Sequence, residues 1–240
     1  IKTILTAGVF ESKLSSILDV FILESKSDYK FSFLPNYTGV KIRIQKLNDG
    51  ISKEDFSSYI KNVVSEIKEY VYGFDDDSIQ GHIVSLMKFK KQTLSIAESC
   101  SGGLISKMIT DISGSSLIFK GGVVAYSDNM KIDFLGVEEK QINDNGAVSS
   151  EVAISMAKNI KNKLNSDFGI STTGVSGPTG GTKDKPVGLV YIAIAFSDDQ
   201  AIVKKFNLLP DRDKHRKMTS HIALNMLRLL IINKKTFDLK

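Results

Sequence analysis

The chain has 240 residues, of which 42% are hydrophobic and 25% charged, and its formal net charge is +5. These values are typical of a globular protein with one large domain or two small ones. The apolar runs are too short to span a bilayer, which excludes a membrane-spanning protein, and the single cysteine excludes an intramolecular disulfide and fits a cytoplasmic location.

The first 73 residues are predicted to form a small α+β domain. The chain begins without Met, in what reads as the middle of a strand, so we expect a trimmed N-terminus. An apolar stripe predicts a helix over residues 11–24. Alternating apolar and polar residues predict strands over 31–34 and 40–44, which a proline- and glycine-containing turn joins into a hairpin.

A domain boundary is predicted after Gly73, where an acidic run interrupts the pattern. A second helix precedes this boundary and begins after Ser52, a favourable N-cap. Another helix follows the boundary and is capped by Asp77 or a neighbour. The predicted domains are therefore residues 1–73 and 74–240.

Strand and helix patterns alternate over the rest of the chain, which predicts an α/β domain in which helices cover a sheet in three layers. Strands are expected over residues 93–97, 122–126, 168–172, 187–196 and 201–206, and helices over 102–110, 149–164 and 211–232. The surplus of basic residues lies mostly in 204–240, where a solvated helix face is the favoured interpretation over a nucleic-acid site.

Three polar, glycine-containing segments are expected at strand ends, where α/β sheets bind ligands. They are Glu98–Gly103, the pair Gly114–Leu117 and Ala125–Lys131, and Thr173–Gly181. The first opens a helix, so its free N–H groups suit an anion, although a simple capped turn explains it equally well.

The glycine loop Thr173–Gly181 matches neither a Walker A loop nor a Rossmann turn. Ordering so many glycines costs conformational entropy, which favours backbone contact with a ligand. A mobile surface loop is the competing interpretation.

A serine nucleophile needs a base, and no histidine lies in the three segments. A Ser–Lys pair is the remaining option, with Lys131 after a strand as a candidate base that burial would hold neutral. Cys100 is a second candidate nucleophile, although a small buried apolar group is the favoured interpretation. The three histidines have no zinc-ligand spacing, so no metal is expected.

Six motifs occur in the order seen in the CinA family, whose C-terminal domain the chain resembles from about residue 74 to 232. Residues 1–73 resemble the middle, KH-like domain of full-length members, and the family's N-terminal molybdopterin-binding-like domain is expected to be missing. Ser101, Val175 and Ser176 stand where Thr, Ile and Ala are common in the family. The motifs are AESCSGG (97–103), GSS (114–116), AYSDNMK (125–131), GAVS (146–149), TGVSGPTGG (173–181) and KPVG (185–188).

The resemblance implies hydrolysis of the carboxamide of nicotinamide mononucleotide, a step of pyridine nucleotide salvage, without cofactor or metal. It implies Ser116 as the nucleophile and Lys131 as the base, and Tyr126 as the tyrosine of the same motif, which we expect to orient either the lysine or the carboxamide. The substrate-binding residues it implies are Ser99, Ser101, Gly102, Gly103, Thr173, Gly174, Gly177, Gly180 and Arg212, with Arg216 as an alternative to Arg212.

Two other functions compete with this amidohydrolase. One is a module that binds nucleotides or nucleic acid without catalysis, and the other is a Ser–Lys amidohydrolase for a different substrate. Residues 1–73 are expected to serve as a linker or dimerisation element, and the resemblance implies a homodimer with a small-molecule nucleotide substrate. Neither a membrane nor a nucleic-acid partner is expected.

Overall fold

The computed structural model describes residues 1–197 and 200–233, which form two compact units, Ile1–His82 and the residues from Ile83 onward. The division falls inside helix α4 (Ile79–Lys90), later than the boundary expected after Gly73. Ser78 caps this helix, because its hydroxyl accepts a hydrogen bond from the Gly81 N–H at 3.2 Å. The two units are described separately.

The first unit is a four-stranded antiparallel sheet with strand order β2-β3-β1-β4. Its core contains Ile4, Ile42 and Ile44 from the sheet together with Leu14 and Val63 from the helices. The elements are β1 (Lys2–Thr6), α1 (Glu11–Ile17), α2 (Asp19–Glu24), β2 (Tyr29–Asn36), β3 (Gly39–Lys46), α3 (Lys53–Glu66) and β4 (Val71–Phe74).

The predicted hairpin is confirmed as β2 and β3, and the predicted cap of α3 is confirmed by the Asp55 N–H, which donates to the Ser52 hydroxyl at 2.9 Å. The single helix predicted over residues 11–24 is wrong. Two helices meet at Leu18, whose ψ of 6° departs from helical geometry. Strand β4 had no alternating pattern strong enough to predict, because it is only four residues long.

The second unit is built on a five-stranded sheet with order β6-β5-β7-β8-β9. Strands β6, β5 and β7 are parallel, whereas β8 and β9 run antiparallel. Their bounds are β5 (Leu94–Glu98), β6 (Phe119–Val124), β7 (Phe168–Gly174), β8 (Leu189–Phe196) and β9 (Gln200–Asn207).

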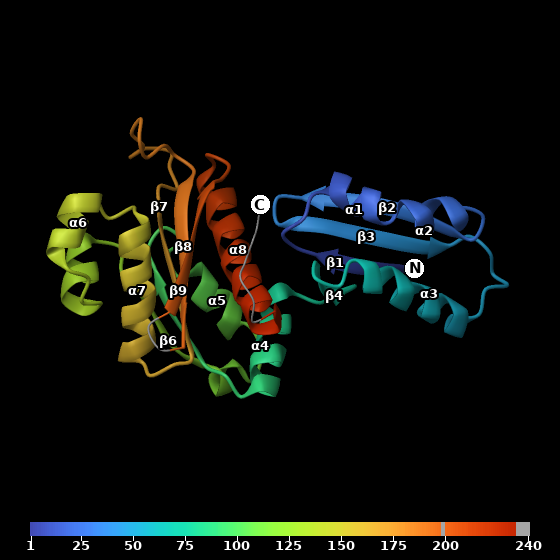
Figure 1. Ribbon diagram of the computed structural model, residues 1–240, viewed down its shortest axis with the longest axis horizontal. Helices are drawn as coiled ribbons and strands as arrows, with labels where there is room; N and C mark the ends of the chain where they lie inside the picture. The colour runs from blue at the N-terminus through green and yellow to red at the C-terminus, as the bar shows by residue number, and fades with distance from the viewer. Residues whose placement is uncertain (198–199, 234–240) are drawn as a thin grey trace. The chain divides into compact units, whose positions relative to one another are not determined.

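Helices cover both faces of this sheet, so the predicted three-layer α/β arrangement is confirmed (Figure 1). Helix α7 (Ser150–Lys163) packs on one face through Ala153 and Ala157, which meet Ala193 and Ala195 of β8. Helices α5 (Leu104–Thr110) and α8 (Arg212–Asn233) lie on the other face. The short α6 (Glu139–Asn145) was not predicted.

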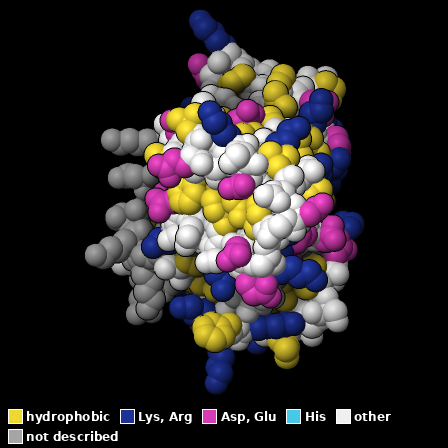
Figure 2. Space-filling view, turned by 90° about the vertical axis from the view of Figure 1, so that its right-hand side faces the viewer, with side chains coloured by type: hydrophobic (Ala, Val, Ile, Leu, Met, Phe, Trp, Pro, Cys, Tyr) yellow, Lys and Arg dark blue, Asp and Glu magenta, His cyan; other side chains and the backbone are white. Residues whose placement is uncertain are grey.

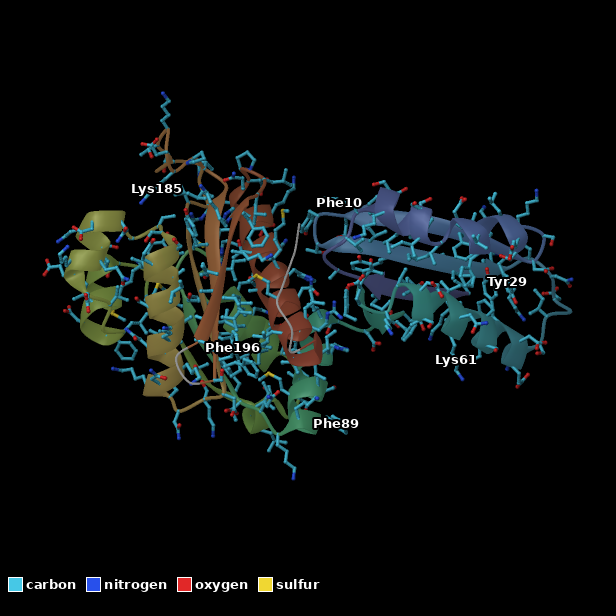
Figure 3. The ribbon with its side chains drawn as sticks, in the orientation of Figure 1. Phe10, Tyr29, Lys61, Phe89, Lys185 and Phe196 are labelled. Carbon is cyan, nitrogen blue, oxygen red and sulfur yellow. The ribbon has the colours of Figure 1, made fainter. Side chains whose placement is uncertain are left out.

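The carboxyl ends of β5, β6 and β7 lie at one edge of the sheet, because the three strands are parallel. The glycine loop between β7 and β8 extends from this edge, and Figure 3 labels Lys185 in it, whose Nζ donates to the Asn145 carbonyl. The first turn of α8 reaches the same edge, since Arg212 donates a hydrogen bond to the Gly177 carbonyl at 3.0 Å. Within the described ranges, no helix is long and apolar enough to cross a membrane.

Candidate functional site

A cavity of about 190 Å³ opens at the carboxyl edge of the parallel strands, where α/β sheets bind their ligands. Residues from the loops after β5, β6 and β7, from the segment before α7 and from the start of α8 meet there. The lining residues are Ser99, Cys100, Tyr126, Asp128, Lys131, Ala147, Val148, Thr173, Gly174, Ser176 and Arg212.

Ser99 lies at the sharp turn that joins β5 to α5. Glu98 is fully buried, and its carboxylate accepts hydrogen bonds from the Ile105 N–H at 3.1 Å and from the Ser106 N–H at 2.8 Å. Gly102 and Gly103 have φ values of 61° and 88°, a left-handed conformation that disfavours other residues. The capped helix and the glycine turn therefore hold Ser99 at the cavity wall.

The hydrogen bonds of Ser99 involve its main chain and not its hydroxyl. Its backbone N–H donates to the Thr172 carbonyl at 3.0 Å, which fixes the main chain, but its Oγ has no hydrogen-bond partner among the residues described. In the described part of the chain no backbone carbonyl accepts from the N–H groups of Cys100 and Ser101, which lie beside the Cys100 sulfur. A sulfur is a weak acceptor, so these two donors beside the Ser99 hydroxyl suit an oxyanion that would form on attack by Ser99.

Lys131 belongs to a short π-helical turn, η2 (Met130–Phe134), which follows β6. Its side chain is buried at 2% exposure, and Nζ contacts the Ser127 carbonyl and an Asp128 carboxylate oxygen, each at 3.4 Å. Both distances exceed the usual 2.7–3.2 Å range, so neither contact holds the amine tightly. Lys131 can therefore turn toward a partner across the cavity.

Tyr126 and Arg212 form the outer rim of the cavity. One nitrogen of the Arg212 guanidinium donates to the Tyr126 hydroxyl at 3.1 Å and the other to the Gly177 carbonyl at 3.0 Å. Arg216 instead donates to the carbonyls of Ser101 and Gly102 and does not line the cavity. Of the two candidate arginines, Arg212 is the one placed to meet a ligand.

The glycine loop contributes its first residues to the cavity. Thr173 lines it, and its hydroxyl donates to the Ala147 carbonyl at 2.7 Å, which ties the loop to the segment before α7. A Cβ at Gly174 would lie 2.5 Å from the Leu189 carbonyl oxygen, so glycine is needed there for strand packing. Gly177 and Gly180 lie outside the lining, as do Ser101, Gly102 and Gly103.

The structure does not bring Ser116 and Lys131 together, and this corrects the expected catalytic pair. Ser116 lies in the turn η1 (Ser115–Leu117), which precedes β6, whereas Lys131 follows β6. A strand of six residues spans roughly 20 Å, so the two side chains lie at opposite edges of the sheet. The segment Gly114–Leu117 follows helix α5 rather than a strand, which is why its expected position was wrong.

Cys100 is unsuited to be a nucleophile. Burial raises the pKa of its thiol to about 12, so the reactive thiolate is scarce at neutral pH. This agrees with the interpretation of Cys100 as a small buried group.

Three polar side chains of the site were missed from the sequence. Asp128 lines the cavity beside Lys131, and its position within the AYSDNMK motif was a usable signal. Ser176 also lines the cavity, and its Oγ lies 2.9 Å from Nδ1 of the fully buried His215. No local sequence pattern predicts this pair, because His215 lies 39 residues away on α8.

No cluster of metal-binding side chains occurs within residues 1–197 and 200–233.

Comparison with known proteins places the second unit in a family. The model of the CinA C-terminal domain matches residues 76–231. A putative competence-damage inducible protein from Halothermothrix orenii is 40% identical over 92% of this chain, and a CinA-like protein from Amoebophilus asiaticus is 36% identical over 95% of it. The chain spans about half the length of these relatives, 52% and 55%.

Solved structures agree with this assignment. The competence/damage inducible protein CihA from Agrobacterium tumefaciens is 34% identical, and its match covers 63% of this chain and 93% of that protein with a TM-score of 0.62. A CinA superfamily protein from Escherichia coli is 26% identical and covers 65% of this chain and 92% of its own, with a TM-score of 0.61. The comparisons therefore support both the fold of the second unit and its membership of the CinA family.

Proposed function

The chain belongs to the CinA family, and on that premise we propose that it hydrolyses the carboxamide of nicotinamide mononucleotide to nicotinic acid mononucleotide and ammonia. The observation that carries this proposal is the cavity in which a free serine hydroxyl, a buried lysine and an arginine converge. These groups match the parts that amide hydrolysis of a phosphorylated substrate requires. The reaction serves pyridine nucleotide salvage in the cytoplasm.

In this proposal Ser99, and not Ser116, is the nucleophile. Ser99 lines the cavity with Lys131, its hydroxyl has no partner among the described residues, and N–H donors to which no described backbone carbonyl is bonded lie on the following two residues. A nucleophile followed directly by oxyanion donors at a strand–helix turn resembles the arrangement in other serine hydrolases. Ser116 does not line the cavity, and the N–H groups of the two residues after it, Leu117 and Ile118, already donate to the carbonyls of Gly114 and Ser115.

The reaction begins when Ser99 Oγ attacks the carboxamide carbon and Lys131 takes the hydroxyl proton. The N–H groups of Cys100 and Ser101 stabilise the oxyanion that forms. The C–N bond then breaks, Lys131 delivers its proton to the leaving nitrogen, and ammonia departs. Lys131 next removes a proton from water, and the water oxygen attacks the acyl-enzyme. The bond between Ser99 Oγ and the acyl carbon then breaks, Lys131 returns the proton to Ser99 Oγ, and the acid product loses its own proton to solvent as it leaves as the carboxylate.

The substrate phosphate is assigned to Arg212. Its guanidinium lies at the rim of the cavity, and the Tyr126 hydroxyl and the Gly177 carbonyl hold two of its nitrogens. The fork of an arginine retains further N–H donors for phosphate oxygens. In this proposal Tyr126 positions Arg212, whereas the sequence led us to expect that it orients the lysine or the carboxamide.

The test is ammonia release from nicotinamide mononucleotide by the wild-type chain and by Ser99→Ala, Lys131→Met and Ser116→Ala. We expect the first two variants to lose roughly a thousandfold or more in kcat, and their combination to lose little further, because the two residues act as a unit. Ser116→Ala is the matched control and should retain wild-type turnover.

A different result would redirect the assignment. Loss of turnover in Ser116→Ala with full turnover in Ser99→Ala would refute the nucleophile proposed here. A folded wild-type chain that releases no ammonia would favour a binding module.

Figure 2 shows acidic, basic and hydrophobic side chains interspersed on the face it presents, without a continuous basic patch there. That face therefore gives no support to nucleic-acid binding.

A further inference from the structure

Ser176 occupies a position in the cavity wall next to the proposed nucleophile. Its Oγ lies 3.2 Å from the carbonyl oxygen of Cys100, the residue that follows Ser99. It also lies 2.9 Å from Nδ1 of His215 on α8. Ser176 is buried at 5% exposure, yet it lines the same cavity as Ser99 and Lys131.

The hydrogen bonds of Ser176 determine where its proton points. A hydroxyl has one proton and two lone pairs, and a carbonyl oxygen can only accept. The Ser176 proton is therefore directed at the Cys100 carbonyl, and the contact with His215 requires that Nδ1 carries a proton and donates it. One lone pair of Ser176 Oγ then remains for the cavity.

The surroundings of His215 support this assignment. The ring is fully buried, and its Nε2 has no hydrogen-bond partner in the part of the chain that the structure describes. Burial lowers the pKa of His215, which keeps the ring neutral with a single proton. The carbonyl groups of Gly188 and Leu189 lie near the ring and act to raise its pKa, but neither makes a hydrogen bond with Nε2 of acceptable geometry. A proton on Nδ1 has Ser176 as acceptor and is therefore the better satisfied of the two.

We propose that Ser176, held by His215, is a specificity-determining residue that presents a hydrogen-bond acceptor to the substrate and so selects the carboxamide over the carboxylate product. This inference rests on the proposed function. A carboxamide nitrogen carries two N–H donors, whereas an ionised carboxylate has only acceptors. The free lone pair of Ser176 accepts from the amide and repels the carboxylate, which favours release of the product.

The test measures binding in the Ser99→Ala background, in which neither ligand is turned over. Calorimetry gives the Kd of nicotinamide mononucleotide and of nicotinic acid mononucleotide, before and after addition of Ser176→Ala. We expect the amide to bind about three- to tenfold more weakly, the range of one neutral hydrogen bond, while binding of the acid is unchanged or tighter. A merely structural role would weaken both ligands by the same factor.

Two further variants keep this test decisive. Ser176→Ala alone leaves the buried Nδ1–H of His215 without an acceptor, so the double variant Ser176→Ala/His215→Val, which removes both partners, guards against misfolding. It should show the same selective loss. Thr179→Ala, an exposed change in the same loop, is the control and should alter neither Kd.

The outcomes separate this inference from the proposed function. If the wild-type chain releases ammonia but the ratio of the two Kd values is the same with and without Ser176, the inference is wrong and the function stands. If ammonia is not released but the ratio falls as expected, the reaction is wrong and the binding role of Ser176 stands. If Ser99→Ala binds neither mononucleotide, both are wrong.

Discussion

Glu98 joins the end of β5 to the start of α5 through a single buried carboxylate. It accepts hydrogen bonds from two backbone N–H groups and, at 2.7 Å, from the Ser106 hydroxyl. We expect Glu98→Gln to lower the free energy of unfolding by about 1.5–3 kcal/mol, because bonds to a charged acceptor are lost. Urea denaturation checks this, with the exposed Glu139→Gln as a control that should change stability by less than about 0.5 kcal/mol. Equal changes in the free energy of unfolding for the two variants would show that the Glu98 carboxylate does not stabilise the turn.

The two histidines of α8, His215 fully buried and His221 partly buried, predict how stability depends on pH. Burial lowers the pKa of both His215 and His221, so the folded state binds protons less readily than the unfolded state. Their contribution to stability is therefore complete above the unfolded value of about 6.5 and is lost as the pH falls through the folded values.

We expect the free energy of unfolding to fall between pH 7.5 and 5, by at most about 1.4 kcal/mol per pH unit for each histidine. Denaturation curves at four pH values measure this slope. Ser176→Ala/His215→Val should flatten it, because one of the two groups is removed. An unchanged slope in that variant would show that His215 does not titrate in this window.

The first turns of α8 hold the three loops of the site together. Arg212 reaches the glycine loop and Tyr126, His215 reaches Ser176, and Arg216 reaches the turn after Ser99. His215 and Arg216 lie three and four residues after Arg212, so all three side chains project from the same side of the helix. One helix face therefore supplies a contact to each of the three loops, and Arg212 is the one of these residues that we assign to the substrate phosphate.

Replacement of the two arginines should have different consequences. We expect Arg212→Ala to raise the KM for nicotinamide mononucleotide by roughly 10- to 100-fold, because charged hydrogen bonds to phosphate are lost. The KM for nicotinamide riboside, which has no phosphate, should change far less. Arg216→Ala should instead lower kcat for both substrates and lower the melting temperature. A similar rise of the KM for both substrates in Arg212→Ala would show that Arg212 does not bind the phosphate.

The whole chain consists of two compact units, and the family match lies almost entirely in the second. The solved relatives match about 63% of this chain over 93% of their own length. A chain that begins at residue 76 keeps Ser78, the cap of α4, and should fold and release ammonia with a kcat/KM within about threefold of the full chain.

The same truncation tests the role proposed for the first unit. Light scattering should show a dimer for the full chain, and a monomer for the truncated chain if residues 1–73 carry the dimer contact. A loss of activity well beyond tenfold in a folded truncated chain would instead assign the first unit a part in the reaction.

Local patterns determined most of the fold before any coordinates were considered. Apolar periodicity identified the long helices and strands, and the predicted cap Ser52 marked where α3 begins. These features depend on neighbours in sequence, so they are visible in sequence. The motifs also identified Lys131, Tyr126, Ser99, Thr173 and Arg212, all of which line the cavity.

Tertiary structure alone decided which of these residues meet. Ser116 and Ser99 each stand in a serine- and glycine-containing motif, but only Ser99 follows a parallel strand, and strand direction decides which edge of the sheet a loop occupies. The pairing of Ser176 with His215 depends on where α8 packs, which no local pattern encodes. Sequence therefore indicated the chemistry, and the parallel sheet and the packing of α8 selected the residues that can perform it.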